Sequence, residues 1–295
     1  MKISEGLALW SEYQRNIQGR SENTVKNYIS DVMQFAKVEQ LEEVDTNKAI
    51  VEHYALTMAK KGLSAASRSR KITSLQMFYK YLQEHEIINA NPTLGLVKPK
   101  IPQKKVKAMG KEEVEAVIQV AKNRDSSKKD YFRNLTLISL LFSTGLRRNE
   151  VINVKVSDVD ISENSLLVRE GKGNKQRIVY YSDEMKAMLS DFIVNHRHNL
   201  THADGEYLFP SNKGEKMSPD NVNSVVNSLY EEAGVKSKGY VVHSTRKAFA
   251  TAVYNATGDI VAVQSLLGHS SPQTTMRYVM ADEAVKKRAA QCFSF

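Results

Sequence analysis

Cysteine is nearly absent from this sequence of 295 residues, in which Cys292 is the single one. One cysteine cannot form an intramolecular disulfide, which fits a reducing compartment and predicts a cytoplasmic protein. Long apolar runs are also missing, because Leu135–Phe142 is interrupted by Thr136 and Ser139 and is too short to span a bilayer. The start of the chain lacks the basic residues and the apolar stretch of a secretory signal. Secretion and membrane insertion are therefore not expected.

Charge, in contrast, is plentiful and unbalanced. The chain carries 42 lysines and arginines against 33 acidic residues, a net charge of +9. With 41% hydrophobic and 25% charged residues, its composition is that of a folded globular protein and not of a disordered or collagen-like chain. The length predicts two domains, each with its own hydrophobic core. The positive excess favours a polyanionic partner, although many proteins of similar charge never bind nucleic acid.

A short segment between the two expected domains concentrates positive charge. Residues 98–107 hold five lysines, two prolines and no acidic residue. Prolines at this density oppose both a helix and a central strand, so we predict an extended linker over residues 96–108. This linker is either a solvated hinge or a strap along a phosphate backbone. Its candidate DNA-binding residues are Lys98, Lys100, Lys104, Lys105 and Lys107.

Residues 1–95 are predicted to form a bundle of four helices, because apolar residues recur at helical spacing in four places. Ser21 or Asn23 is expected to cap the second helix, and Ser64 or Ser67 the fourth. The helical segments are about 4–16, 25–36, 47–61 and 67–82.

Arg68 and Lys71 lie one turn apart on the fourth of these helices, beside its apolar stripe. They are expected to share one face of the helix. Such a cationic face is either simply solvated or in contact with DNA, and both residues are candidates for DNA binding.

Residues 109–295 are predicted to form a second domain that is mainly helical with a small β-sheet. One helix opens after Gly110, and an apolar helix ends at Gly145. Two β-rich runs, 166–168 and 177–181, are joined by a glycine-rich turn and predict a hairpin. The rest of the domain is mostly helical in pattern, so the fold class is α+β with helices in the majority.

Several side chains of this second domain suit phosphate chemistry, and each also has an ordinary structural explanation. Arg147 follows a glycine that ends an apolar helix, where a bend can aim a guanidinium into a cleft, but arginine is common at such ends. Lys172 lies between two glycines at the hairpin tip, either as a plain turn residue or as a mobile ammonium that donates a proton. His243 and Arg246 either open a helix as capping residues or form part of a phosphate site.

Two further residues follow near the end of the chain. His269 comes directly after Gly268, where the pattern indicates a helix stop. Tyr278 lies nine residues later. A lone tyrosine is usually half-buried in a core, and nothing in the local sequence makes Tyr278 a nucleophile.

Taken together, in this order and spacing, these segments resemble the tyrosine recombinase family, which includes the integrases and the Xer-type site-specific recombinases. The resemblance covers essentially the whole chain. It implies a helical, SAM-like core-binding domain at 1–95, a basic linker at 96–108 and a catalytic domain with a C-terminal tail at 109–295. The matching segments are Thr144-Gly145-Leu146-Arg147 with Glu150, Gly171-Lys172-Gly173-Asn174-Lys175, His243-x-x-Arg246, Leu267-Gly268-His269 and Tyr278.

The resemblance implies a transesterification on DNA. Tyr278 would attack a phosphodiester, which leaves a 3′-phosphotyrosyl link and a free 5′-hydroxyl. Arg147 and Arg246 would hold the non-bridging oxygens, a task that suits planar and permanently charged groups. Lys172 would protonate the departing 5′-oxygen.

The remaining residues take supporting roles in the same implied reaction. His243 would help to move the tyrosine proton, His269 would hydrogen-bond the phosphate, and Glu150 would orient an active-site cation. One phosphoester is exchanged for another, so the resemblance implies neither ATP nor a metal ion or other cofactor. The sequence agrees, since it has no Gly-x-x-x-x-Gly-Lys-Ser/Thr loop and no close carboxylate cluster suited to Mg²⁺.

Three positions depart from the pattern of the family, and none of them replaces a residue with a catalytic role. Lys247 stands where many relatives carry histidine. Arg148-Asn149 stands where a small residue and serine are common, and Tyr180-Tyr181 where Pro-Leu is frequent.

The implied partner is double-stranded DNA with an inverted-repeat core site, bound by a tetramer of this chain, with a partner recombinase or accessory factor as an option. The tail 279–295 docks either on its own domain or on a neighbouring protomer. Integration, excision and dimer resolution are all consistent with the sequence. Two other functions stay open, namely a catalytically silent DNA-binding accessory protein and a DNA-relaxing enzyme similar to topoisomerase IB.

Overall fold

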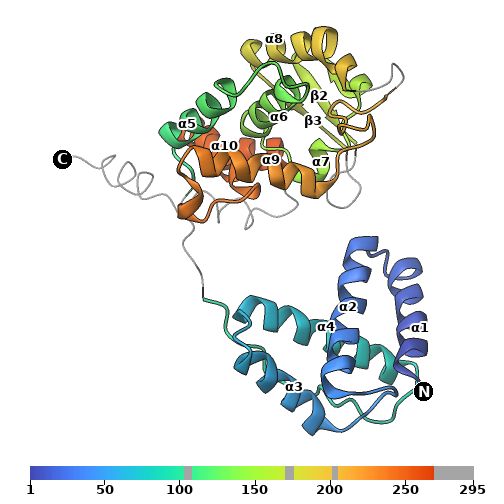
Figure 1. Ribbon diagram of the computed structural model, residues 1–295. Coiled ribbons are helices and arrows are strands. Elements are labelled where there is room, and N and C mark those ends of the chain that lie inside the picture. Colours follow the sequence, from blue (N-terminus) through green and yellow to red (C-terminus); the bar gives the residue numbers. More distant parts are fainter. Residues whose placement is uncertain (103–107, 170–175, 201–204, 269–295) are drawn as a thin grey trace, which may run out of the picture. The chain divides into compact units, whose positions relative to one another are not determined.

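A computed structural model divides the chain into two compact units, the N-terminal unit (Met1–Lys104) and the C-terminal unit (Lys105–Phe295), shown in Figure 1. None of the described helices is long and apolar enough to cross a membrane. The described residues are 1–102, 108–169, 176–200 and 205–268.

The N-terminal unit is helical, as the apolar spacing predicts. Two of its helices begin at serines: Ser21 accepts a hydrogen bond from the backbone N–H of Thr24, and Ser64 accepts one from that of Ser67. These caps satisfy backbone donors that a helix leaves open at its start. The helices are α1 (Ile3–Asn16), α2 (Glu22–Glu39), α3 (Lys48–Lys60) and α4 (Ala65–Glu84).

Aromatic side chains fill the centre of this unit. Trp10 is fully buried, stacks on Tyr28 with ring centroids 5.8 Å apart and meets the edge of Phe78 at 5.4 Å. Phe35 and Tyr54 form a further edge-to-face pair at 5.2 Å. Because these rings come from α1, α2, α3 and α4, their burial holds all four helices on one core.

A buried carboxylate joins α2 to α4. Asp31 is 1% exposed and accepts hydrogen bonds from Arg70 at 2.5 Å, Lys71 at 3.0 Å and Ser74 at 2.8 Å. The prediction that Arg68 and Lys71 share a cationic face is therefore wrong for Lys71. Its side chain points to Asp31 and is only 11% exposed, since a buried acid attracts the nearest cation of the facing helix. In this structure Lys71 is engaged by Asp31 and by Gln34.

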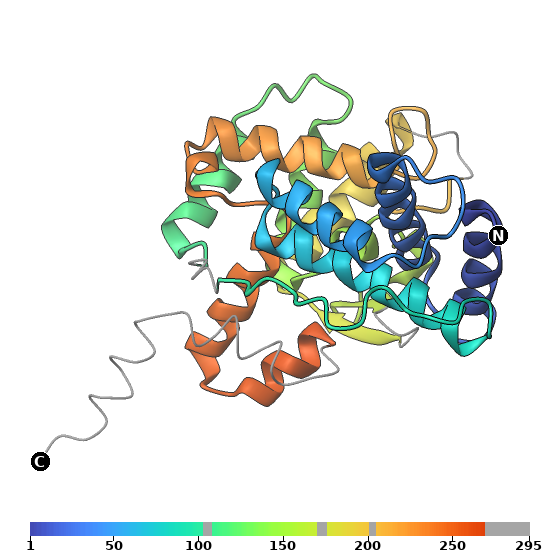
Figure 2. The ribbon, with the colours of Figure 1, turned by 90° about the horizontal axis from the view of Figure 1, so that it is seen from below.

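The C-terminal unit contains the other helices and the sheet. Helix α6, the apolar helix of the sequence, packs against α5, α8 and α10 and so lies at the centre of the unit (Figure 1). Helices α10 and α11 lie side by side, orange to red in Figure 2. The helix bounds are α5 (Lys111–Lys122), α6 (Tyr131–Thr144), α7 (Arg148–Val151), α8 (Asp183–Asp191), α9 (Pro219–Glu232), α10 (His243–Thr257) and α11 (Ile260–Leu267).

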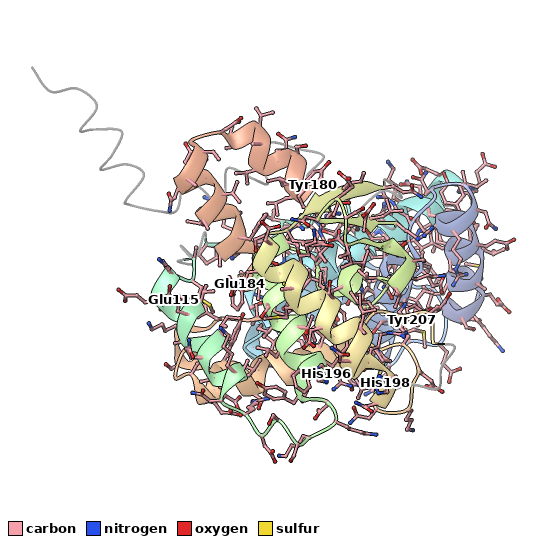
Figure 3. The ribbon with its side chains drawn as sticks, turned by 90° about the horizontal axis from the view of Figure 1, so that it is seen from above. Glu115, Tyr180, Glu184, His196, His198 and Tyr207 are labelled. Carbon is pink, nitrogen blue, oxygen red and sulfur yellow. The ribbon has the colours of Figure 1, made fainter. Side chains whose placement is uncertain are left out.

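The sheet contains the predicted hairpin and one additional short strand. Strands β2 (Ser165–Val168) and β3 (Arg177–Tyr180) pair antiparallel, with Leu166 opposite Val179, and β1 (Val159–Asp160) pairs with the other edge of β2. Alternation along β3 turns Arg177 and Val179 inward, whereas Tyr180 is 60% exposed on the outer face (Figure 3). The strand that starts at Arg177 therefore presents a charged side chain to the interior.

Removal of the buried carboxylate of the N-terminal unit should be costly. Asp31→Ala leaves Lys71 buried without its counter-charge and should lower the free energy of unfolding of this unit by about 3–5 kcal/mol. Urea denaturation followed by tryptophan fluorescence measures this, because Trp10 is the only tryptophan of the chain. Glu84→Ala, which removes an exposed ion pair with Lys80, is the control and should change little. Equal stability of the two variants would contradict the assignment.

Candidate active site

The turn after α6 directs Arg147 into a cleft. Gly145 ends α6 in the left-handed conformation, with φ +64°, and a Cβ at this position would lie 2.6 Å from Cδ1 of Phe249. A glycine is thus required both by the backbone and by the close packing of α10. The chain leaves this turn through buried Leu146 and reaches Arg147 at the start of α7.

Arg147 shares a cleft of about 390 Å³ with His243, the first residue of α10. The segments 146–149 and 241–243, far apart in the sequence, form its walls together with Asn223 of α9. The sequence-predicted Arg147 and His243 are therefore brought together. A cationic and an imidazole group at one opening suit the recognition of a phosphate with proton transfer nearby.

The surroundings of His243 favour the neutral form of its imidazole. Its side chain keeps an exposed surface, but partial desolvation lowers the pKa of the imidazole below its ordinary value of 6.5. The positive charges of Arg246, Lys247 and Arg147 lower this pKa further. Lys247, which departs from the family's pattern at its position, thus contributes to the electrostatics of His243. A neutral imidazole near neutral pH can accept a proton.

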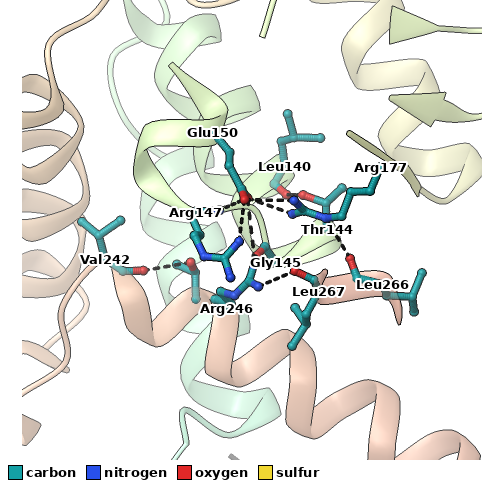
Figure 4. Close-up of polar contacts among 11 residues, drawn as sticks. Leu140, Thr144, Gly145, Arg147, Glu150, Arg177, Val242, Arg246, Leu266 and Leu267 are labelled. Atoms are coloured by element: carbon teal, nitrogen blue, oxygen red, sulfur yellow. Dashed lines mark hydrogen bonds and ion pairs between the residues drawn. The ribbon is translucent and has the colours of Figure 1, made fainter. Parts of the chain in front are cut away.

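Glu150 is buried next to the cleft and lies within 4 Å of three arginine side chains (Figure 4). It is 4% exposed and accepts hydrogen bonds from the backbone N–H of Arg147 at 2.8 Å and from Nη1 of Arg147 at 2.6 Å. Arg177 of β3 adds a two-bond contact at 2.9 and 2.8 Å, and Nη1 of Arg246 lies 3.8 Å away. Three guanidinium groups thus surround one carboxylate.

These arginines control the ionisation of Glu150. Burial by itself would raise the pKa of the carboxyl group, but the hydrogen bonds and charge of Arg177, together with those of Arg147, outweigh it. The pKa of Glu150 falls to about 2. The residue is therefore a permanent anion at neutral pH, and the cluster keeps a net positive charge.

Arg246 is held by backbone carbonyls as well as by charge. It is fully buried, and its Nη1 and Nη2 donate to the carbonyl oxygens of Gly145 at 2.7 Å and Leu267 at 2.5 Å (Figure 4). Because His243 opens α10 while Arg246 lies beneath it, the two residues do not present one common exposed face. They belong to the same site at different depths.

Sequence reasoning missed Arg177 as a member of this cluster. Its side chain is 11% exposed, and Nε donates to the carbonyl oxygen of Leu266 at 3.3 Å. The available signal was a charged residue two positions from apolar Val179, which places it on the inward face of the predicted strand. A buried charge of this kind requires a partner, and Glu150 is the partner.

Three sequence-predicted residues, Lys172, His269 and Tyr278, lie outside the described residues. The same holds for Lys104, Lys105 and Lys107 of the basic segment, whereas Lys98 and Lys100 are exposed. Within the described ranges, no group of three or more His, Cys, Asp or Glu side chains is arranged to hold a metal ion.

Family models match both parts of the chain. The model described as phage integrase family matches residues 107–284, and the one described as phage integrase, N-terminal SAM-like domain, matches residues 7–86. The chain belongs to the phage integrase family. The resemblance inferred from the arginine, lysine, histidine and tyrosine segments is thereby confirmed.

Curated relatives within this family are similar over most of their length. A tyrosine recombinase XerC of Staphylococcus saprophyticus is 31% identical over 272 residues, which cover 90% of both chains. A tyrosine recombinase XerC of Leptospira interrogans is 29% identical over 290 residues, 97% of this chain and 92% of the relative.

Solved structures support the fold. The crystal structure of the XerA recombinase is 29% identical, covers 99% of both chains and has a TM-score of 0.57. The XerH site-specific recombinase, solved with a palindromic difH substrate in a post-cleavage complex, is 22% identical and covers 90% of this chain and 78% of its own, with a TM-score of 0.75. Helices in the majority, with a small antiparallel sheet, are thus confirmed as the fold class.

Replacement of Glu150 by glutamine should change how stability depends on pH. A pKa lowered from 4.5 to about 2 means that the contribution of Glu150 to stability is complete above pH 4.5 and is lost as the pH falls toward 2. This contribution corresponds to roughly 3 kcal/mol. Urea titrations of the wild type and of Glu150→Gln between pH 2 and 7 should show a difference that shrinks over this acidic range. A difference that is independent of pH would contradict the low pKa.

Proposed function

We propose that this chain is a site-specific DNA recombinase that breaks and rejoins DNA through a covalent 3′-phosphotyrosyl intermediate. The observation that carries the proposal is the cleft in which Arg147 and His243 lie above the buried Glu150 cluster, in a chain of the phage integrase family. An excess of guanidinium over carboxylate suits the stabilisation of the negative charge that develops during phosphoryl transfer.

Each residue of the site has a role in this reaction. Tyr278 is the nucleophile, and Arg147 and Arg246 offset the charge of the pentacoordinate phosphate. Arg246 is fully buried in this structure, and we propose that DNA binding brings it into contact with the phosphate. Lys172 protonates the leaving 5′-oxygen.

The histidines and Glu150 complete the assignment. His243 accepts the phenolic proton of the tyrosine, a task that its lowered pKa suits. His269 hydrogen-bonds the phosphate, and Glu150 orients the cations around it. The exchange of one phosphoester for another conserves the number of bonds, so the reaction as proposed uses residues of the chain alone.

The proposed partner is duplex DNA with an inverted-repeat core site, as the palindromic substrate of the XerH structure suggests for a relative. Arg68, Lys98 and Lys100 are the DNA-binding candidates among the described residues, and Lys104, Lys105 and Lys107 extend them along the basic segment. We further propose that four copies assemble on two DNA sites, with a partner recombinase or accessory factor as an option. We further propose that the reaction takes place in the cytoplasm.

Trapping of the covalent intermediate tests the proposed nucleophile. On a DNA duplex with a nick close to the cleavage position, the short piece that carries the newly freed 5′-hydroxyl diffuses away after attack, so the strand cannot be rejoined. The wild type should therefore accumulate as a protein–DNA adduct on a denaturing gel. Tyr278→Phe removes the attacking oxygen and should form no adduct, while it keeps its affinity for the same DNA in a mobility-shift assay. An adduct formed by Tyr278→Phe would show that another residue attacks. Relaxation of plasmid DNA without any sequence preference would favour a topoisomerase instead.

The pH dependence of cleavage tests the role of His243. The rate of adduct formation should fall on the acidic side only below pH 6.5, because the charges around the imidazole lower its pKa. Lys247→Met removes one of these charges and should move this acidic limb to higher pH. Lys213→Met, a change at an exposed lysine, is the matched control and should leave the profile in place. If the two variants give identical pH profiles, neither the effect of Lys247 on His243 nor the role of His243 in proton transfer holds.

A further inference from the structure

The carboxylate of Glu150 has no hydrogen-bonding capacity to spare. Its Oε1 accepts from Nη1 of Arg147 at 2.6 Å and from Nη1 of Arg177 at 2.9 Å. Its Oε2 accepts from the backbone N–H of Arg147 at 2.8 Å and from Nη2 of Arg177 at 2.8 Å. A carboxylate offers about four acceptor positions, and all of them are filled. Arg246, at 3.8 Å, lies just beyond hydrogen-bond distance.

The two arginines share this carboxylate unequally. Arg177 binds it with two parallel bonds, one to each oxygen, which is the strongest arrangement between a guanidinium and a carboxylate. The side chain of Arg147 gives it a single bond and stays 25% exposed toward the cleft. Arg177, at 11% exposure, faces the interior. The more buried arginine is therefore the main counter-ion, and the more exposed one is left with donors that point elsewhere.

We propose that Arg177 is a positioning residue that occupies Glu150 and thereby keeps Arg147 available for a phosphate. This inference rests on the proposed function and adds a residue to it. If Arg177 is removed, two acceptor positions open on a buried anion. Arg147 then closes onto Glu150 with a two-bond contact, and Arg246 moves in from 3.8 Å. Both movements withdraw positive charge from the place where the phosphate binds.

Two neighbours hold Arg177 in this role. Its Nε donates to the carbonyl oxygen of Leu266, in the last turn of α11. Gly268 follows, with φ +62°, and a Cβ built on it would lie 2.7 Å from Cδ of Arg177. Because the guanidinium of Arg177 is anchored to both Glu150 and Leu266, the side chain cannot give way without breaking these bonds. Glycine at position 268 therefore leaves the space that Arg177 occupies.

The first experiment compares the rate of adduct formation and the affinity for DNA in three proteins. They are the wild type, Arg177→Met, and the double variant that combines Arg177→Met with Glu150→Gln. At saturating nicked DNA, Arg177→Met should form the adduct about 100-fold more slowly, since a misplaced catalytic group costs this much, while its affinity for DNA changes little. The double variant should recover by roughly tenfold, because a neutral amide does not draw Arg147 away. A double variant as slow as the single one, or a single variant as fast as the wild type, would overturn the proposal.

A matched pair of glycine substitutions separates backbone strain from the loss of Arg177. Gly258, at the end of α10, has φ +68°, and no atom of the described residues lies within 4 Å of the position that a Cβ would take there. Gly258→Ala and Gly268→Ala therefore both place an alanine at positive φ, but only Gly268→Ala displaces Arg177. Thermal unfolding should shift in both, and slow adduct formation should appear only in Gly268→Ala. Equal rates in the two variants would contradict the proposed contact.

A chemical readout measures the availability of Arg147 without any cleavage. Phenylglyoxal reacts with accessible guanidinium groups; the folded protein is labelled first, and mass spectrometry of its peptides after digestion reports the labelling of Arg147. Labelling should slow in Arg177→Met and recover in the double variant. If the wild type forms no adduct but labelling follows this pattern, the proposed function fails and the positioning role stands. If adducts form but the labelling of Arg147 is the same in all three proteins, the positioning role fails.

Discussion

The ion cluster at Glu150 is the interaction on which the C-terminal unit depends. One buried carboxylate connects α7, β3 and α10, segments that lie far apart in the sequence, through Arg147, Arg177 and Arg246. Charges buried at this depth are tolerated only when each finds a partner, so the three segments cannot shift independently. The cleft that holds Arg147 and His243 is positioned by the same contacts.

Backbone carbonyl groups also hold arginines of the cluster in place. The carbonyl oxygens of Gly145 and Leu267 hold Arg246 from two directions, and both belong to the ends of helices. At such ends the last carbonyl groups have no partner within the helix, so they are suited to receive a guanidinium. Gly145 and Gly268 allow these ends to approach closely, because a side chain on either would collide with Phe249 or Arg177. The cluster thus forms where two helices stop.

Local patterns in the sequence predicted much of this arrangement. The caps at Ser21 and Ser64, the helix end at Gly145 and the hairpin of β2 and β3 all follow from a few neighbouring residues. The part that local patterns could not supply depends on contacts between distant segments. The sequence around Arg177 predicts only a strand, and its contact with Glu150, 27 positions earlier, is seen only in the folded structure. The strand β1, only two residues long, carries too little pattern to be predicted.

Lys71 and Arg147 show why the position of a basic residue does not by itself decide its use. Each lies near an acid, yet Lys71 is 11% exposed against Asp31 and Arg147 is 25% exposed above Glu150. Asp31 engages Arg70, Lys71 and Ser74, and among the described residues no more deeply buried cation takes the place of Lys71. At Glu150 a second and deeper arginine, Arg177, supplies the main compensation, and Arg147 stays partly exposed. How exposed a paired cation remains therefore depends on what else neutralises its carboxylate, and only the folded structure contains that information.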